Sequence, residues 1–187
     1  MQRLITILSV LLVAAPALAY RPPLPETEWD ESTQLTLARA MVGEADWHEP
    51  DHVAIAFVLA RRWRIHQQNR EPLPFARYIE LYSASLRSDS SRSEWIRALP
   101  WGPLAGPYGT RWDRIQKLVR AWGAGRVKDP CPSAMHWGGA MDRPSRSLSP
   151  ISCGLTRNIF YTQRERVVAT QSLTSRADQD ASLRAAR

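Results

Sequence analysis

The chain has 187 residues, a length that suits one domain of ordinary size with tails. Its 25 Lys and Arg residues outnumber its 18 Asp and Glu residues and give a formal net charge of +7 at pH 7. A basic protein inside the cell would raise nucleic acid as a partner, but this sequence carries no nucleic-acid-binding motif and its N-terminus favours export. We therefore expect anionic polymers of the cell envelope as partners and no nucleic acid.

Residues 1–19 have the organisation of a secretory signal peptide. Arg3 supplies a positive charge, residues 4–13 are apolar, and Ala17-Leu18-Ala19 is a small-x-small cleavage site. The apolar stretch is too short to span a membrane, and no later stretch is apolar enough. We expect cleavage near Ala19 and a secreted or periplasmic protein without stable membrane insertion; the alternative is an uncleaved single-pass anchor.

Three segments are expected after the signal peptide. Residues 20–31 are rich in Pro and predict a linker, and residues 32–169 form one domain. Residues 170–187 are polar and predict a disordered tail.

The domain opens with a predicted amphipathic helix. Apolar residues recur at helical spacing from Leu35 to Ala45, and Ser32 or Thr33 can cap the helix start. Glu44 falls at the border of the apolar face, in the last turn of this helix.

A second helix is predicted to begin at Pro50 and Asp51, because Pro is favoured in a first turn. Residues 53–60 are apolar on all sides, which is typical of a buried central helix. The helix continues to Arg64, where it must reach the surface.

The rest of the domain alternates short helices with loops. Helices are predicted over 76–81 and 112–122, loops over 83–93 and 100–109, an irregular lobe over 129–154, and a short strand or helix start over 158–162. The sequence therefore predicts an all-α or α-dominated α+β fold, a single domain whose cleft walls are built from loops.

The only two cysteines, Cys131 and Cys153, lie in and beside the Gly-, Pro- and Ser-rich lobe. In an oxidising compartment an even pair of cysteines favours a disulfide. We expect this bond to hold an otherwise floppy segment, and two cysteines without a nearby His pattern do not predict a zinc site.

Glu44 has the setting that a general acid requires. Such an acid must be protonated near neutral pH, a state that nearby apolar surface and the negative end of a helix dipole both favour. Glu44 lies beside the apolar face and near the helix C-terminus. Taken alone, the position also fits a surface glutamate at a helix end.

Three blocks of sequence resemble one known family. Residues 37–45 read L-A-R-A-M-V-G-E-A and residues 53–62 read V-A-I-A-F-V-L-A-R-R; residues 125–137 read G-R-V-K-D-P-C-P-S-A-M-H-W; residues 158–161 read N-I-F-Y. In this order they are similar to the paired helices, the "G-x-x-x-D-P-T-x-G-A-x-H-F" cleft segment and the "H-x-F-Y" ending of the SleB-like cell-wall hydrolases, the family of spore-cortex-lytic enzymes.

The resemblance implies a lysozyme-like catalytic domain over 32–169 that cleaves peptidoglycan glycan strands, as a lytic transglycosylase or a muramidase-type glycosidase. Glu44 matches the family's catalytic glutamate. It would protonate the oxygen that links N-acetylmuramic acid to N-acetylglucosamine, and then accept the proton of the muramyl 6-hydroxyl as that group attacks C1. This mechanism needs no second carboxylate, metal or cofactor, and we expect a monomer.

The matching positions also imply contacts with sugar, at Ser133, His136, Trp137, Asn158 and Tyr161. Aromatic rings suit stacking on sugar faces. The alternative is that His136 is a structural histidine and that Trp137 packs in the core. The sequence departs from the family at three of its positions, where Cys131, Ser133 and Asn158 replace Thr, Gly and His, and a disulfide at Cys131 would reshape the cleft.

Four other tryptophans stand at helical or loop positions: Trp95, Trp101, Trp112 and Trp122. We expect them to pack rather than to bind. Trp101, in the Gly- and Pro-rich loop, is the best placed of them for an additional sugar subsite.

Two rival functions remain open. Residues 48–52 spell H-E-P-D-H, which matches the H-E-x-x-H zinc metalloprotease signature, with Glu71 or Glu80 as a third ligand. That motif needs a helix through all five residues, and Pro50 in the middle disfavours one by roughly 3 kcal/mol. The other rival is a non-catalytic peptidoglycan-binding protein, which the departures from the family pattern would favour.

Overall fold

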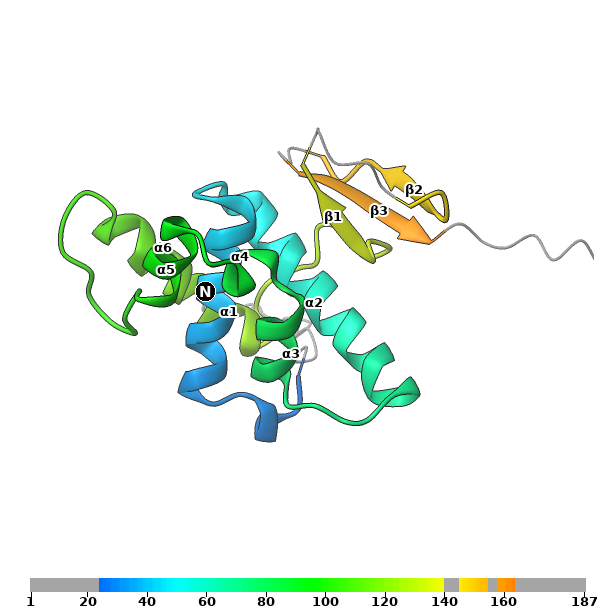
Figure 1. Cartoon of the computed structure of the whole chain (residues 1–187), viewed down its shortest axis with the longest axis horizontal. Coiled ribbons are helices and arrows are strands. Elements are labelled where there is room, and N and C mark those ends of the chain that lie inside the picture. Colours follow the sequence, from blue (N-terminus) through cyan, green and yellow to red (C-terminus); the bar gives the residue numbers. More distant parts are fainter. Residues whose placement is uncertain (1–23, 140–144, 155–157, 164–187) are drawn as a thin grey trace, which may run out of the picture.

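The computed structural model describes residues 24–139, 145–154 and 158–163. Within these residues helices dominate, and a small three-stranded sheet lies at one side of the helical body (Figure 1). The predicted α-dominated α+β class is confirmed, and the sheet excludes its all-α variant. The predicted signal peptide and the predicted tail from residue 170 lie outside the described residues. No helix in the described part of the chain is long and apolar enough to cross a membrane.

The described helices begin with a single 3₁₀ turn. In chain order they are η1 (Glu26–Glu28), α1 (Glu31–Ala45), α2 (Glu49–Asn69), α3 (Phe75–Tyr82), α4 (Ala84–Arg87), α5 (Ser91–Arg97) and α6 (Gly109–Gly123). Helix α1 starts earlier than predicted, because the Asp30 carboxylate caps it by accepting a hydrogen bond from the Thr33 N–H at 2.7 Å. Pro50 stands in the first turn of α2, as predicted.

The prediction of a loop over residues 83–93 was wrong, since this segment contains α4 and the start of α5. Its serines act as helix caps and bridges. The Ser90 hydroxyl accepts a hydrogen bond from the Ser93 N–H at 3.2 Å and so begins α5. Composition alone does not separate a serine-rich loop from two short capped helices.

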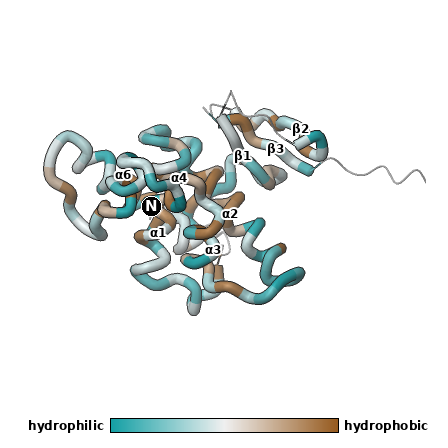
Figure 2. The backbone as a smooth tube through the Cα atoms, viewed as in Figure 1, coloured by the Kyte–Doolittle hydropathy of each residue, from teal (hydrophilic) through white to brown (hydrophobic). Residues whose placement is uncertain are grey.

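The core forms where α1 packs against α2, α3 and α6. Brown, apolar segments of these helices face one another in Figure 2, and teal segments lie outside. The apolar run 53–60 lies in α2, and most of its side chains are fully buried, as predicted for a central helix.

The Pro-rich segment that the sequence predicts as a linker is packed against the domain from Leu24 onward. The Leu24 side chain is buried, and the Trp29 ring contacts the ring of Trp122, with 5.4 Å between the ring centroids. The Glu28 carboxylate accepts a hydrogen bond from the Phe75 N–H at 2.8 Å, at the start of α3. Large apolar side chains in this segment therefore fix it despite its prolines.

The sheet consists of β1 (His136–Gly138), β2 (Leu148–Ile151) and β3 (Ile159–Gln163), in the order β1-β3-β2. Both pairings are antiparallel, and the central residue Tyr161 lies opposite His136 on one side and Pro150 on the other. The lobe over 129–154 is thus less irregular than predicted. The sequence did not predict its strands because they are too short to show an alternating pattern.

A disulfide between Cys131 and Cys153 joins the segment before β1 to the segment after β2. This bond confirms the predicted pairing. Short strands of this kind are marginal alone, so the crosslink is one of the constraints that hold the lobe together.

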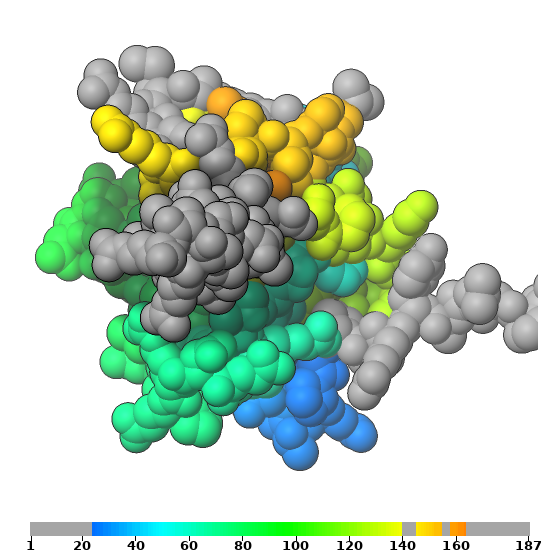
Figure 3. Space-filling model, turned by 90° about the vertical axis from the view of Figure 1, so that its right-hand side faces the viewer, coloured from blue at the N-terminus to red at the C-terminus, as the bar shows by residue number. Residues whose placement is uncertain are grey.

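Arg61 of α2 ties this lobe to the helical body. Its guanidinium donates hydrogen bonds to the carbonyls of Ala134 at 2.8 Å and Cys131 at 2.9 Å, and it pairs with the Asp129 carboxylate. In Figure 3 strands β2 and β3, in yellow and orange, lie along one edge of the face, above the turquoise end of α2. One side chain therefore fixes three points of the segment that leads into β1.

Replacing Arg61 by Ala should loosen the lobe, because it leaves two carbonyls and a carboxylate without their charged donor. We expect a loss of about 2 kcal/mol or more in the free energy of unfolding, measured by urea denaturation. Amide exchange should rise first in β1 and β3. Arg87→Ala, at an exposed position of α4, is the control; equal losses in the two variants would contradict the role of Arg61.

Candidate functional site

Glu44 lies in the last turn of α1, and its side chain is half-buried. Its Oε1 atom accepts three hydrogen bonds: from the Ser83 hydroxyl at 2.6 Å, from the Ser85 hydroxyl at 2.9 Å and from the Ser85 N–H at 3.1 Å. Both serines come from the junction between α3 and α4. The short helices over 83–93 thus hold one oxygen of this carboxyl in place.

The other oxygen of Glu44 faces the sheet. Its Oε2 atom accepts a hydrogen bond from the Trp137 indole N–H at 3.3 Å, and Trp137 is the central residue of β1. Among the residues that the structure describes, Oε1 thus accepts from three donors, whereas Oε2 accepts from one at a longer distance. Of the two oxygens, Oε2 is the better placed to exchange a proton with a bound molecule.

Gly43 makes room for this arrangement. A Cβ atom at position 43 would lie 2.0 Å from the Ser85 hydroxyl oxygen and 2.4 Å from its Cβ. Both distances are shorter than atoms tolerate, so any side chain at this position would displace Ser85. The glycine before Glu44 therefore has a packing reason within the site.

The turn after Glu44 has an unusual backbone that a buried histidine supports. Asp46 has a φ of 55°, which is rare for a residue other than glycine. The Nε2–H of His52 donates a hydrogen bond to the Asp46 carbonyl at 2.8 Å, and the His52 side chain is fully buried. Burial lowers the pKa of His52, so its ring is neutral and donates from Nε2.

A buried carboxylate connects this turn to the sheet. Asp51, in the first turn of α2, accepts a hydrogen bond from the Asn158 N–H at 2.6 Å. The Asn158 side-chain amide donates to the Glu44 carbonyl at 3.4 Å. His48 Nδ1 lies 3.1 Å from the other oxygen of Asp51. Asn158 thus contacts the backbone of Glu44.

The structure separates the residues that the sequence predicts as sugar contacts. Trp137 lies at the Glu44 carboxyl and Asn158 behind it. Ser133 is exposed and is not among the described groups that contact the carboxyl. Tyr161 is 5 % exposed, so a sugar would reach its ring only if the surrounding side chains moved.

His136 lies on the opposite face of the strand from Trp137, the residue that contacts the Glu44 carboxyl. Consecutive residues of a strand point to opposite faces of a sheet, and His136 lines a cavity of about 400 Å³ together with Arg62 and Tyr82. Burial and the nearby Arg62 guanidinium lower the pKa of His136. The segment that resembles the family therefore places side chains on both faces of the sheet.

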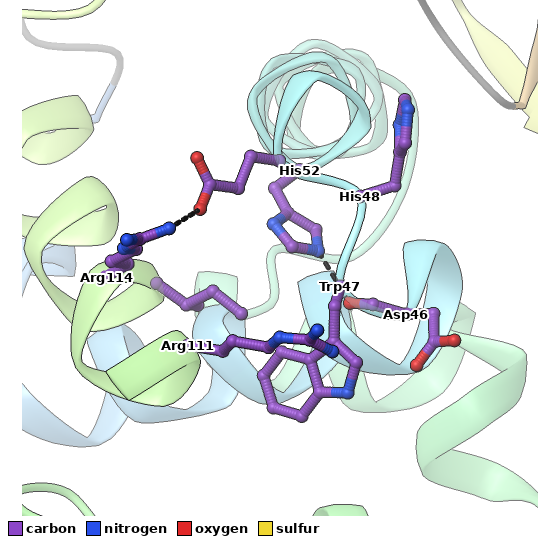
Figure 4. Close-up of a pocket in the computed structure, with 8 residues that line it drawn as sticks. Asp46, Trp47, His48, His52, Arg111 and Arg114 are labelled. Carbon is purple, nitrogen blue, oxygen red and sulfur yellow. Dashed lines mark hydrogen bonds and ion pairs between the residues drawn. The ribbon is translucent and has the colours of Figure 1, made fainter. Parts of the chain in front are cut away.

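The H-E-x-x-H sequence does not form a single helical face. Helix α2 begins at Glu49, and His48 is its N-cap residue. The ring of His52 turns toward the Asp46 carbonyl, whereas the ring of His48 points elsewhere (Figure 4). Among the residues that the structure describes, no three His, Cys, Asp or Glu side chains converge as metal ligands.

Sequence reasoning missed Ser83, Ser85 and Gly43. The two serines follow directly after the predicted helix 76–81, but no spacing rule connects them to a residue about 40 positions earlier. The one signal in the sequence is Gly43 itself. A glycine inside a helix destabilises it by about 1 kcal/mol relative to Ala, so its presence there indicates a packing or functional role.

No protein-family model, curated protein or solved structure matches this chain. The likeness of residues 37–161 to the cell-wall hydrolases therefore stays a prediction.

Gly43→Ala should destabilise the protein although Ala favours helix formation, because the new methyl group collides with Ser85. We expect a loss of about 1–3 kcal/mol in the free energy of unfolding, measured by urea denaturation. Ser85→Gly removes both colliding atoms, so Gly43→Ala should cost little or nothing when it is added to Ser85→Gly. Equal costs in both backgrounds would show that the collision is not the cause.

Stability should fall as the pH drops below about 6.5, the ordinary pKa of His. The unfolded chain binds a proton at His52 in this range and the folded chain does not, so acid favours unfolding by up to about 1.4 kcal/mol per pH unit. His52→Gln keeps an N–H donor for Asp46 and cannot titrate. Its unfolding free energy, measured from pH 7.5 to 5, should fall less steeply than that of the wild type; parallel slopes would contradict this assignment.

Proposed function

We propose that this protein cleaves the glycan strands of bacterial peptidoglycan, with Glu44 as general acid and then as general base. The observation that carries the proposal is the fixed carboxyl of Glu44, with Oε1 held by Ser83 and Ser85 and with Oε2 turned toward Trp137. A glycosidic bond breaks when an acid protonates its leaving oxygen while positive charge develops on the sugar ring.

The proposed step uses each oxygen of the carboxyl differently. Protonated Glu44 donates from Oε2 to the oxygen between N-acetylmuramic acid and N-acetylglucosamine, and the bond to C1 breaks. The muramyl 6-hydroxyl attacks C1, and Oε2 takes its proton. The product is a 1,6-anhydro sugar, water is not consumed, and Glu44 returns to its starting protonation state. The serine contacts at Oε1 would keep the carboxyl oriented through both transfers.

The placement of nearby carboxylates supports a mechanism with one acid. Asp51 is fully buried and accepts a hydrogen bond from the Asn158 N–H. The Asp46 carboxylate lies 3.6 Å from the Arg92 guanidinium. Glu49 is paired with Arg114 at 3.5 Å. Each carboxylate close to Glu44 in sequence thus has its own partner, and none of these contacts involves the Glu44 side chain.

The basic character of the protein fits an anionic polymer that carries peptide carboxylates. The disulfide between Cys131 and Cys153 is compatible with action outside the cytoplasm, because such bonds form and persist in oxidising compartments. A secreted or periplasmic enzyme is therefore part of the proposal.

Mass spectrometry of the soluble products from purified peptidoglycan tests the proposal. The wild type should release anhydro-muropeptides, and Glu44→Gln should release none while it keeps the wild-type unfolding free energy within about 1 kcal/mol. Glu49→Gln, at an exposed position nearby, is the matched control and should stay active.

Each other product identifies a different reaction. Release of sugars with reducing ends would show that the reaction is hydrolysis and not transglycosylation, with Glu44 still as the acid. Cut peptides on intact glycan, lost with a chelator or with His48→Ala, would establish the metalloprotease. Binding to peptidoglycan without any product would establish a non-catalytic binding protein, and an active Glu44→Gln variant would exclude the proposed mechanism.

A further inference from the structure

Three aromatic side chains form a cluster near the end of α1: the half-buried Trp47 and the exposed Trp95 and Tyr108. The ring of Trp47 is stacked on that of Tyr108, with centroids 5.3 Å apart and an interplanar angle of 10°. The Trp95 ring meets both edge-on, at 6.3 Å from Trp47 and 5.8 Å from Tyr108. Trp95 is 39 % exposed and Tyr108 is 43 % exposed.

Packing against the core accounts for Trp47 but not for the exposed rings of Trp95 and Tyr108. The indoles of Trp112 and Trp122 are fully buried, and the ring of Trp101 packs against the core under the Arg120 guanidinium, 4.7 Å above it. Among the described residues the other exposed large apolar side chains, Ile65 and Leu81, stand singly on α2 and α3. Grouped exposed aromatic rings are typical of a binding surface. Trp95 is therefore better exposed than Trp101 for a contact with sugar.

We propose that Trp47, Trp95 and Tyr108 bind the sugar rings of a glycan strand at a distance from the cleaved bond. Aromatic rings present flat apolar faces on which pyranose rings stack. This inference rests on the proposed function for the identity of the strand, and the cluster itself supplies the class of ligand, a carbohydrate.

Charged groups for sugar hydroxyls lie directly beside the rings. Arg92 precedes Trp95 by three residues and therefore lies on the same side of α5, and its guanidinium lies 3.6 Å from the carboxylate of Asp46. Both groups are about half exposed, at 58 % and 49 %. Sugar sites combine such planar charged groups, which bond to hydroxyls, with aromatic faces.

A hollow beside Trp47 brings together charged groups of both signs, because Asp46 and Glu49 line it as well as two arginines. It has a volume of about 370 Å³, and Arg111 and Arg114 of α6 line it opposite the turn that carries Trp47 (Figure 4). Guanidinium groups favour carboxylates. Arg114 is accordingly paired with Glu49 at 3.5 Å, so the hollow offers a glycan both donors and acceptors for its hydroxyls.

The cluster is continuous with the Glu44 site. Trp47 stands three residues after Glu44, and α5 packs on the last turn of α1, where Ile96 comes within 3.4 Å of the position of a Cβ on Gly43. Strand β1, which carries Trp137, lies on one side of this helix end, and α5 and α6 lie on the other side (Figure 1). A strand bound over Glu44 would thus have an aromatic contact in each direction.

The test measures binding of soluble peptidoglycan glycan strands of two lengths, by calorimetry, to full-length Glu44→Gln, which should not cleave them. Trp95→Ala and Tyr108→Ala, each added to Glu44→Gln, should weaken binding of long strands by about tenfold. They should leave binding of a disaccharide unchanged, because it occupies only the Glu44 side. Leu81→Ala, an exposed apolar position elsewhere, is the control and should change neither.

Unchanged binding of long strands by both aromatic variants, with thermal unfolding like that of the parent, would overturn this inference and leave the role of Glu44 intact. Self-association of the wild type that both aromatic variants abolish, without any loss of glycan binding, would overturn it in favour of a contact between two copies. If the wild type cleaves no glycan but loses strand binding through these variants, the sugar surface stands and the proposed catalysis fails.

Discussion

The carboxyl group of Glu44 is the point where the helical body and the sheet meet. Its donors are Ser83, Ser85 and Trp137, which are 39, 41 and 93 residues away in the chain. A carboxylate taken partly out of water needs such partners, and here they come from separate parts of the fold. The site can therefore form only when α1, the α3–α4 junction and β1 are all in their native positions.

Several features that look unrelated in the sequence help to hold these parts of the fold in their native positions around Glu44. Gly43 lets Ser85 approach, and Arg61 anchors the segment that leads into β1. The disulfide closes the lobe that carries the strands. Asn158, on the way into β3, joins the buried Asp51 to the backbone of Glu44. Rigid contacts of this kind around the carboxyl are what a group that must transfer a proton in a fixed direction requires.

The sequence is informative about helices and weak about the parts that complete the site. The 3.6-residue period locates α1, α2, α3 and α6 to within a few residues, because amphipathic helices of this length carry a strong signal. The strands of the lobe have three to five residues, too few for an alternating pattern to stand out. Ser90 caps α5, and both α4 and α5 are stabilised by contacts with α1, which a serine-rich composition does not reveal.

The sequence likewise predicts only some residues of the candidate site. Motif order predicts Glu44 and Trp137 as site residues, and the structure brings them together. The split between Trp137 and His136 follows from strand alternation, which can be applied only once β1 is known. The aromatic cluster of Trp47, Trp95 and Tyr108 joins segments that are far apart in the chain, and no local sequence pattern predicts such contacts.

The most direct test of the account is a crystal structure of Glu44→Gln bound to a tetrasaccharide of alternating N-acetylglucosamine and N-acetylmuramic acid. We expect the side chain at position 44 to keep its contacts with Ser83 and Ser85 through one terminal atom. The other terminal atom should lie within hydrogen-bonding distance, about 3 Å, of the oxygen that links the two sugars at the cleavage point. A tetrasaccharide bound away from residue 44, or one whose linking oxygen faces another side chain, would contradict the central role of Glu44.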